Sequence, residues 1–230
     1  MKKLGLIGGI GPESTLIYYK KLVYGAQQRT GEHFYPNLTI ESLNVFDVLR
    51  FCQEKDYAGL TRYMMEGVNN LISAGAELIA LTGNTPHIIF DELRARSAVP
   101  MISIVEAASE WATKEKISRA GLLGTAFTMQ EEFFKKPFVQ AGTAIVTPVE
   151  SEMHYIAEKI SSELEHGIVR PETQRSFQRI VNRMVEDEAI DAVILGCTEL
   201  PLVFKKCNLS VRVLDTLEIH TQVLLREAFL

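Results

Sequence analysis

Short apolar runs alternate with longer amphipathic segments along the whole of this 230-residue chain. The runs are almost continuously apolar, which is typical of parallel strands that helices cover on both faces. The longer segments place their apolar residues at helical spacing. Strands are predicted at about 3–8, 37–43, 77–82, 99–103, 119–124, 143–147, 190–196 and 211–214. Helices are predicted at about 12–29, 55–74, 85–97, 104–115, 127–141, 150–166, 172–187 and 216–229.

Three segments of the first half recur in the same order in the second half, about 114 residues further on. The matched pairs are 3–9 with 119–125, 77–85 with 191–199, and 99–103 with 211–215. Three collinear matches at nearly one offset predict two copies of one α/β unit.

We therefore expect an α/β fold of two pseudo-symmetric lobes, each a mostly parallel sheet flanked by helices, with the active site between the lobes. The terminal segment 211–230 repeats 99–115, so each copy's last strand and helix are expected to complete the other lobe. The expected first lobe comprises residues 1–98 and 211–230, and the second comprises 99–210.

Composition narrows the classes of partner. The formal net charge is −5 and no run of Lys or Arg forms a basic stripe, so nucleic acid is not expected as a partner. The three cysteines lack metal-type spacing and are too sparse for a disulfide framework, which is typical of a reducing compartment. No stretch approaches the roughly 18 apolar residues of a membrane helix. We expect a cytoplasmic protein with no metal and no membrane partner.

Four polar turns follow predicted strands, and open α/β sheets bind ligands beyond the carboxyl ends of their strands. These turns are residues 8–11, 82–85, 124–128 and 196–199. Cys197 is the sharpest candidate among them, because it follows a buried strand between Gly196 and Thr198. A place at a helix N-terminus would lower the pKa of its thiol and favour the thiolate. We expect Cys197 to act as a base or nucleophile, and Cys52 and Cys207 to be incidental.

Short hydroxyl and amide side chains occupy the same turns. Each could cap a helix, but together they are suited to hold a carboxylate and to stabilise an enolate-like charge. They are Asn84, Thr85, Thr125, Thr128 and Thr198. Glu199 is either a group that orients the thiol or relays its proton, or a first-turn acid that the helix dipole favours. His87 and His220 lie in predicted helices, where a lone histidine is usually structural.

Four motifs carry a resemblance to a known family. Residues 5–15 read Gly-Leu-Ile-Gly-Gly-Ile-Gly-Pro-Glu-Ser-Thr, and the other motifs are 83–87, 121–125 and 196–199. In this order and spacing they resemble the aspartate/glutamate racemase family over essentially the whole chain. The resemblance implies two pseudo-symmetric lobes with the site between them, no pyridoxal phosphate, no metal, and a homodimer. It also implies one catalytic cysteine per lobe, so that one thiolate removes the Cα proton and the other thiol protonates the opposite face.

Carried over to this sequence, the resemblance assigns the second-lobe catalytic thiol to Cys197. The first-lobe cysteine falls on Gly83, so the hydroxyl of Thr82 or a water molecule would have to serve in its place. A Gly83→Cys variant is therefore expected to raise racemisation. Substrate-holding positions match Gly9, Ile10, Gln53, Asn84, Thr85, Thr125 and Thr198, and the composition of the turns adds Thr128 and Glu199.

The resemblance implies an amino-acid or dicarboxylate substrate similar to aspartate or glutamate. A basic residue of some aspartate-specific relatives falls on Glu165, which leaves Arg50 as the nearby candidate partner for a side-chain carboxylate. The predicted function is that of a cofactor-independent amino-acid racemase or epimerase, an isomerase that abstracts and returns the Cα proton.

Two alternatives remain open. Arylmalonate decarboxylases resemble this chain in having one second-lobe cysteine and a glycine opposite, so a single-thiol decarboxylase of a malonate-like acid is the first alternative. A catalytically degenerate protein that binds an amino acid is the second.

Overall fold

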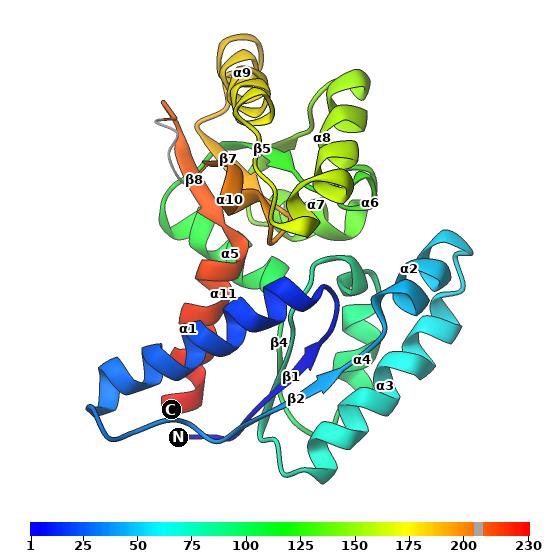
Figure 1. Ribbon diagram of the computed structural model, residues 1–230, viewed down its shortest axis with the longest axis vertical. Helices are drawn as coiled ribbons and strands as arrows, with labels where there is room; N and C mark the ends of the chain where they lie inside the picture. Colours follow the sequence, from blue (N-terminus) through cyan, green and yellow to red (C-terminus); the bar gives the residue numbers. More distant parts are fainter. Residues whose placement is uncertain (205–208) are drawn as a thin grey trace. The chain divides into compact units, whose positions relative to one another are not determined.

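The computed structural model describes residues 1–204 and 209–230, so Cys207 lies outside the described residues. The chain divides into two compact units (Figure 1). Unit 1 consists of Met1–Ile104 and His220–Leu230, and unit 2 consists of Val105–Ile219. Each unit contains a four-stranded sheet whose strand pairs are all parallel.

The sheet of unit 1 has the strand order β2-β1-β3-β4. Its strands are β1 (Leu4–Gly8), β2 (Leu38–Ser42), β3 (Leu78–Leu81) and β4 (Met101–Ile102). Its helices are α1 (Pro12–Thr30), α2 (Val45–Gln53), α3 (Tyr57–Ser73), the 3-10 helix η1 (Thr85–Ile89), α4 (Phe90–Arg96) and the greater part of α11 (Thr216–Phe229). The central strands β1 and β3 are buried throughout, as their continuous apolar runs predict.

The strand order of unit 1 reverses between β1 and β3. Right-handed crossovers therefore put α1, which leads from β1 to β2, on one face of the sheet and α3, which leads from β2 to β3, on the other. Figure 1 shows α1 beside α11, away from α3. A Cβ added at Gly25 of α1 would overlap Leu225 of α11, so these two helices pack at close range. The reversal makes the carboxyl ends of β1 and β3 the position where a ligand is expected.

Unit 2 repeats this topology with the order β6-β5-β7-β8. Its strands are β5 (Arg119–Leu123), β6 (Ala144–Val146), β7 (Ala192–Leu195) and β8 (Arg212–Asp215). Its helices are α5 (Ile104–Lys114), α6 (Ala126–Gln130), α7 (Glu132–Gln140), α8 (Glu150–Ser162), the 3-10 helix η2 (Leu164–His166), α9 (Pro171–Glu188) and α10 (Leu200–Phe204). The order reverses between β5 and β7, so the turns after these two strands occupy the matching position.

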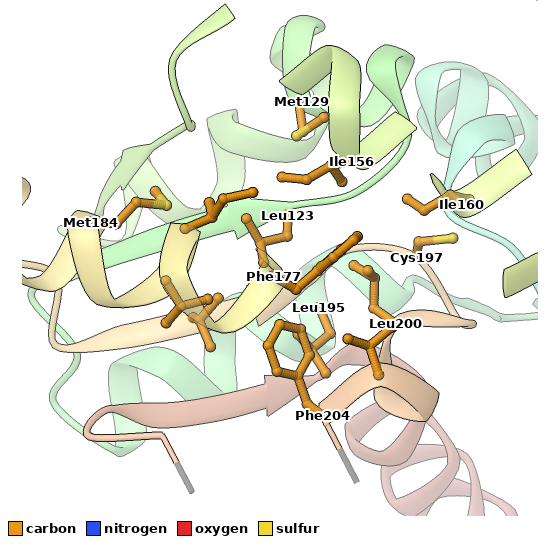
Figure 2. Close-up of a cluster of buried hydrophobic side chains, with 14 of the residues drawn as sticks. Leu123, Met129, Ile156, Ile160, Phe177, Met184, Leu195, Cys197, Leu200 and Phe204 are labelled. Carbon is orange, nitrogen blue, oxygen red and sulfur yellow. The ribbon is translucent and has the colours of Figure 1, made fainter. Parts of the chain in front are cut away.

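The hydrophobic core of unit 2 surrounds the end of β7 (Figure 2). Ile160 of α8, Phe177 of α9, Leu195 of β7 and Leu200 of α10 belong to one buried cluster. Cys197 belongs to the same cluster, and Figure 2 shows its side chain beside Ile160 at the edge of the group. The thiol therefore lies at the edge of this apolar cluster.

All eight predicted strands are confirmed, and so is the fold class. Three of the predicted helices are each divided in two, at 85–97, 127–141 and 150–166. The pattern missed α2 and α10, which have only nine and five residues. Asn44 starts α2, because its side chain accepts a hydrogen bond from the N–H of Phe46.

The exchange expected between the two halves agrees with the two units for the last helices but not for the last strands. β4 pairs with β3 and belongs to unit 1, whereas β8 pairs with β7 and belongs to unit 2. Each terminal strand stays in the sheet of its own copy, since its backbone groups are satisfied by the neighbouring strand there. Only helices depart from the repeat order, because α5 after Ile104 belongs to unit 2 and α11 from His220 belongs to unit 1.

Candidate active site

Gly9 shapes the turn after β1, which is one of the two turns at the reversal of the strand order in unit 1. Its φ of +77° lies in the left-handed region that favours glycine, and an added Cβ would overlap the carbonyl oxygen of Leu43. Its N–H donates to Thr15 Oγ1 at 3.0 Å. The neighbouring Ile10 is buried. Gly9 and Ile10, both expected at the site, thus lie in a tight turn between β1 and α1.

Gly83 lies directly beneath that turn, just after β3. An added Cβ at Gly83 would stand 2.5 Å from the carbonyl oxygen of Ile10 and 3.3 Å from Ile10 Cγ2. A backbone oxygen cannot rotate away as the end of a flexible side chain can, so any side chain at position 83 requires the turn to move. The packing of unit 1 therefore favours glycine at position 83.

The hydroxyl of Thr82 is fully buried and belongs to a polar chain beneath the turn. Thr15 Oγ1 donates to the carbonyl of Gly11 at 3.0 Å, which leaves Thr82 Oγ1 as the donor in their 3.2 Å contact. Thr15 was not among the expected site residues. Its sequence signal was its position four residues after Gly11, from which a helical threonine reaches back to a carbonyl.

His87 holds the Gly83 turn from the other side. The amide N–H of Ile104 donates to His87 Nε2 at 3.3 Å, so the proton of the neutral ring lies on Nδ1, which donates to the carbonyl of Gly83 at 3.0 Å. Burial lowers the pKa of His87 to about 4. The ring also stacks on Phe90 with 4.9 Å between the centroids. His87 is a neutral structural residue.

His220 has the opposite tautomer. Its Nε2–H donates to the carbonyl of Ile102 at 3.1 Å, and its Nδ1 accepts from the hydroxyl of Tyr18 at 2.7 Å. Burial, with a smaller contribution from His87, lowers the pKa of His220 to about 3. The two histidines therefore fix the backbone of residues 102–104 at the end of β4, and neither is poised to carry a catalytic proton.

The corresponding turn of unit 2 follows β5. Thr125 starts α6 and is partly exposed, and its Oγ1 accepts from the amide N–H of Thr128 at 3.2 Å. Thr128 is fully buried, and its hydroxyl lies 3.1 Å from Thr125 Oγ1. A Cβ at Gly124 would stand 3.2 Å from the carbonyl oxygen of Gly196, so the turns after β5 and β7 touch.

Cys197, Thr198 and Glu199 form one hydrogen-bonded cluster after β7. Cys197 Sγ donates to Glu199 Oε2 at 2.9 Å, and Thr198 Oγ1 donates to the same oxygen at 2.9 Å. All three residues are buried. Glu199 therefore accepts the hydrogen bond of the thiol and does not lie in the first turn of α10.

The expected thiolate is not what this environment favours. α10 begins at Leu200, so Cys197 precedes the helix and is not inside its first turn. Burial and the negative charge of Glu199 raise the pKa of Cys197 well above its ordinary value, with a smaller contribution from Glu165. The expectation of a lowered pKa is wrong, because burial and a neighbouring carboxylate both oppose a second negative charge.

Glu165 is an exposed residue of η2 whose charge reaches this cluster. Loss of hydration raises the pKa of its carboxyl group, and the negative charge of Glu199 raises it further. Because Glu165 and Glu199 are 34 residues apart in the sequence, the pattern of residues alone gave no signal that they interact.

Four further candidate residues belong to unit 1, and only two of them lie next to Gly83. Asn84 is buried and Thr85 is the partly exposed first residue of η1, so both flank Gly83. Gln53 is the exposed last residue of α2, and the structure shows no contact between it and the turns after β1 and β3 among the described residues. Arg50 pairs with Asp47 at 3.1 Å on the surface of α2.

Two features are absent from residues 1–204 and 209–230. In that part of the chain, no three His, Cys, Asp or Glu side chains converge to hold a metal ion. None of the helices described there combines the length and apolar character that a membrane span requires.

The chain is similar to known proteins over most of its length. The family model described as Asp/Glu/hydantoin racemase matches residues 7–224. The chain is similar to the broad-specificity amino-acid racemase RacX of Bacillus subtilis, with 24% identity over 220 residues that cover 93% of this chain and 92% of the relative.

Two solved structures resemble the whole chain. An aspartate racemase homologue from Pyrococcus horikoshii is 38% identical, with a TM-score of 0.88. A candidate Asp/Glu racemase from Yersinia pestis is 27% identical, with a TM-score of 0.92. Each comparison covers 100% of both chains. With the family model matching almost the full length, this chain belongs to the Asp/Glu/hydantoin racemase family.

Proposed function

We infer that this protein is an amino-acid racemase or epimerase that works without pyridoxal phosphate, by moving the Cα proton of its substrate. The observation that carries this proposal is the 2.9 Å hydrogen bond from Cys197 Sγ to Glu199 Oε2 at the carboxyl end of β7. A thiol bound to a carboxylate supplies both a proton and a group that accepts it, as proton transfer at carbon requires. Membership of the racemase family supports the same function.

The proposed reaction begins at Cys197. Its S–H bond breaks, and the proton passes to Glu199 Oε2. The thiolate then takes the Cα proton of the substrate and re-forms its S–H bond. The electron pair of the broken C–H bond moves into the substrate carboxylate, which becomes enolate-like. Hydroxyl and N–H groups of the turns after β5 and β7, among them the partly exposed Thr125, would stabilise that charge.

Inversion requires a proton from the opposite face, and Gly83 makes this step slow. In the proposal, Gly83 stands where the family resemblance implies a second thiol. The carbonyl of Ile10 leaves no room for a side chain there, and the hydroxyl of Thr82 is buried against Thr15. The family resemblance leaves Thr82 or a water molecule to deliver the proton, and each is a weaker acid than a thiol. The proton held by Glu199 then passes through solvent to restore this donor. Exchange of the Cα proton is therefore expected to outrun inversion.

A single-thiol decarboxylase of a malonate-like acid is the second candidate. Two observations favour it: the lack of room at Gly83 and the raised pKa of the Cys197 thiol. Loss of carbon dioxide would leave its electron pair as an enolate on the remaining carboxylate. The thiol proton would then form the new C–H bond, and water would reprotonate the sulfur. This reaction requires one proton donor only.

Chiral chromatography of L- and D-amino acids, together with carbon dioxide release from substituted malonates, distinguishes the two candidates. We expect the wild-type protein to invert at least one amino acid, the Cys197→Ser variant to lose this activity, and the Cys52→Ala variant to keep it. Release of carbon dioxide without inversion would replace the racemase by the decarboxylase. Binding of an amino acid without either reaction would indicate a ligand-binding protein, and full activity of Cys197→Ser would exclude a role for this thiol.

A further inference from the structure

The hydroxyl of Thr128 has a single hydrogen-bond partner among residues 1–204 and 209–230. Its Oγ1 lies 3.1 Å from Thr125 Oγ1, and Thr128 is fully buried in the first turn of α6. Solvent therefore cannot serve as a second partner for this hydroxyl. The proton of Thr128 either points to Thr125 or stays without an acceptor.

Two arrangements of the hydroxyl protons fit the 3.1 Å contact. If Thr125 were the donor, the buried proton of Thr128 would have no acceptor, which costs free energy. If Thr128 is the donor, the proton of Thr125 is left over, but Thr125 is partly exposed and can donate to solvent or to a ligand. The second arrangement leaves no buried donor unsatisfied, so Thr128 donates to Thr125.

Thr125 Oγ1 then has no accepting position left. It accepts from the amide N–H of Thr128 at 3.2 Å and from the Thr128 hydroxyl, and a hydroxyl oxygen has two lone pairs. The Thr125 hydroxyl can therefore interact with a ligand only as a donor. A donor of this kind suits a negatively charged oxygen.

Packing fixes the orientation of the Thr128 side chain. A Cβ added at Gly124 would stand 3.2 Å from Thr128 Cγ2, and a Cβ added at Gly196 would stand 3.3 Å from the same methyl carbon. The methyl group of Thr128 thus fills the space beside both glycines. Because the methyl group is held there, the hydroxyl stays on the side of Thr125.

The turn that carries Thr125 is bonded to the turn that carries the thiol. The N–H of Gly196, which directly precedes Cys197, donates to the carbonyl of Leu123 at 2.7 Å. Thr125 follows Leu123 by two residues, so the hydroxyl and the thiol belong to neighbouring turns at the carboxyl ends of β5 and β7. A substrate whose Cα meets Cys197 carries its carboxylate one bond away, and that carboxylate gains charge as the proton leaves.

We propose that Thr128 is a positioning residue: by donating to Thr125, it keeps the Thr125 hydroxyl ready to donate to the substrate carboxylate as negative charge develops there. The proposal rests on the function inferred above, because that function supplies the carboxylate beside Cys197. Thr128 acts through Thr125 and does not touch the substrate, whereas the sequence alone groups it with the residues that hold the substrate.

The test measures kcat/KM for Cα-proton exchange, and stability in urea, for Thr128→Val and Thr128→Ser. Valine has a similar shape but no hydroxyl, and serine keeps the hydroxyl. We expect Thr128→Val to lower kcat/KM about tenfold and Thr128→Ser to keep most of it. Thr143→Val is the matched control, because the buried Thr143 hydroxyl donates to the carbonyl of Ile117 at 3.0 Å, ahead of β5. It should lower stability and leave kcat/KM unchanged.

A double-mutant cycle with Thr125→Ala shows whether Thr128 acts through Thr125. Adding Thr128→Val to Thr125→Ala should cause no further loss of kcat/KM, because the donor that Thr128 orients is already absent. An equal loss in both backgrounds would overturn the proposal. A neutron crystal structure of the wild type tests the donor direction without any variant. The deuteron of Thr128 should point to Thr125 Oγ1, and the reverse direction would overturn the proposal.

Calorimetric binding to the Cys197→Ala protein, with and without Thr128→Val, separates this inference from the proposed function. The probes are the amino acids of the panel and substituted malonates. If no amino acid exchanges but Thr128→Val weakens the binding of a probe, the racemase proposal fails and the inference stands. If exchange occurs and Thr128→Val leaves kcat/KM unchanged, the inference is wrong and the racemase proposal stands. If nothing reacts, and no probe binds or binding ignores Thr128, both are wrong.

Discussion

The Cys197 thiol is protonated at rest, because burial and the charge of Glu199 raise its pKa. A protonated thiol can donate its proton to a substrate carbon or transfer it to the carboxylate of Glu199. It is not a free thiolate that waits for a substrate. In the proposed reaction, the chemistry of this residue therefore depends on Glu199 as much as on the sulfur itself.

Glu199→Gln should lower the pKa of Cys197. The amide is nearly the same size and its oxygen still accepts hydrogen bonds from Cys197 and Thr198, but the negative charge is gone. The pH profile of thiol alkylation, measured in a variant with Cys52 and Cys207 replaced by alanine, reports this pKa. Glu165→Gln should produce a smaller shift in the same direction, since Glu165 contributes less. An unchanged or raised pKa in Glu199→Gln would contradict the assignment of Glu199 as the charge that acts on the thiol.

Gly83→Cys tests whether a second thiol can be accommodated. The sequence predicts that this change raises racemisation, but the Cβ would stand 2.5 Å from the Ile10 carbonyl. We expect a loss of about 1–3 kcal/mol in the free energy of unfolding, measured by urea denaturation, and no gain in activity. Gly25→Ala is the control. Its new methyl group contacts only the flexible side chain of Leu225, and the substitution replaces a glycine within a helix by a better helix former. A stable, faster Gly83→Cys enzyme would show that the turn moves readily.

At the scale of elements, the end of β4 is fixed by two buried neutral histidines. His87 accepts from the N–H of Ile104, and His220 donates to the carbonyl of Ile102. Protonation of His87 would remove its acceptor, and protonation of His220 would remove the acceptor that Tyr18 uses. Both events would also bury a positive charge, which is why the two pKa values are lowered to about 4 and about 3.

Stability should therefore fall as the pH falls from about 6.5, where the unfolded histidines begin to bind protons, toward these folded-state pKa values. The slope that each histidine contributes rises from about 0.7 kcal/mol per pH unit at pH 6.5, where the unfolded ring is half protonated, toward about 1.4 kcal/mol per pH unit near pH 5. Urea denaturation between about pH 6.5 and pH 5 avoids most of the titration of Glu163 and Asp191, whose pKa values are lowered. His87→Gln should remove about half of the slope, while His154→Gln, at an exposed position of α8, should not change it. A wild-type stability that is flat over this range would contradict the neutral buried assignment.

The strands were predictable because a parallel strand covered on both faces must be apolar along its length, as β1 and β3 are. The short helices α2 and α10 were not, since five to nine residues give too little periodicity to recognise. The sequence also does not specify the pairing of the two terminal strands. β4 and β8 repeat each other in sequence, and that similarity carries no information about which sheet each one joins.

For the whole molecule, the repeat predicted the two parallel sheets and located Cys197 and Gly83 after equivalent strands. It could not predict what surrounds them. The pKa of Cys197 depends on the hydrogen bond between its thiol and the carboxylate of Glu199. The lack of space at Gly83 comes from the carbonyl of Ile10, which belongs to a different turn. Both are tertiary contacts, which a linear pattern of residue types does not specify.

The central claim is that one thiol moves the Cα proton and that no equally strong acid serves the other face. Proton NMR of an amino-acid panel in D2O, with chiral analysis of the same samples, tests this claim most directly for wild type and Cys197→Ala. We predict that wild type removes the Cα–H signal of at least one amino acid faster than it inverts that amino acid. Cys197→Ala should be slower by roughly 10²–10⁴-fold. Signal loss that persists in Cys197→Ala, or inversion that keeps pace with exchange in wild type, would contradict the account.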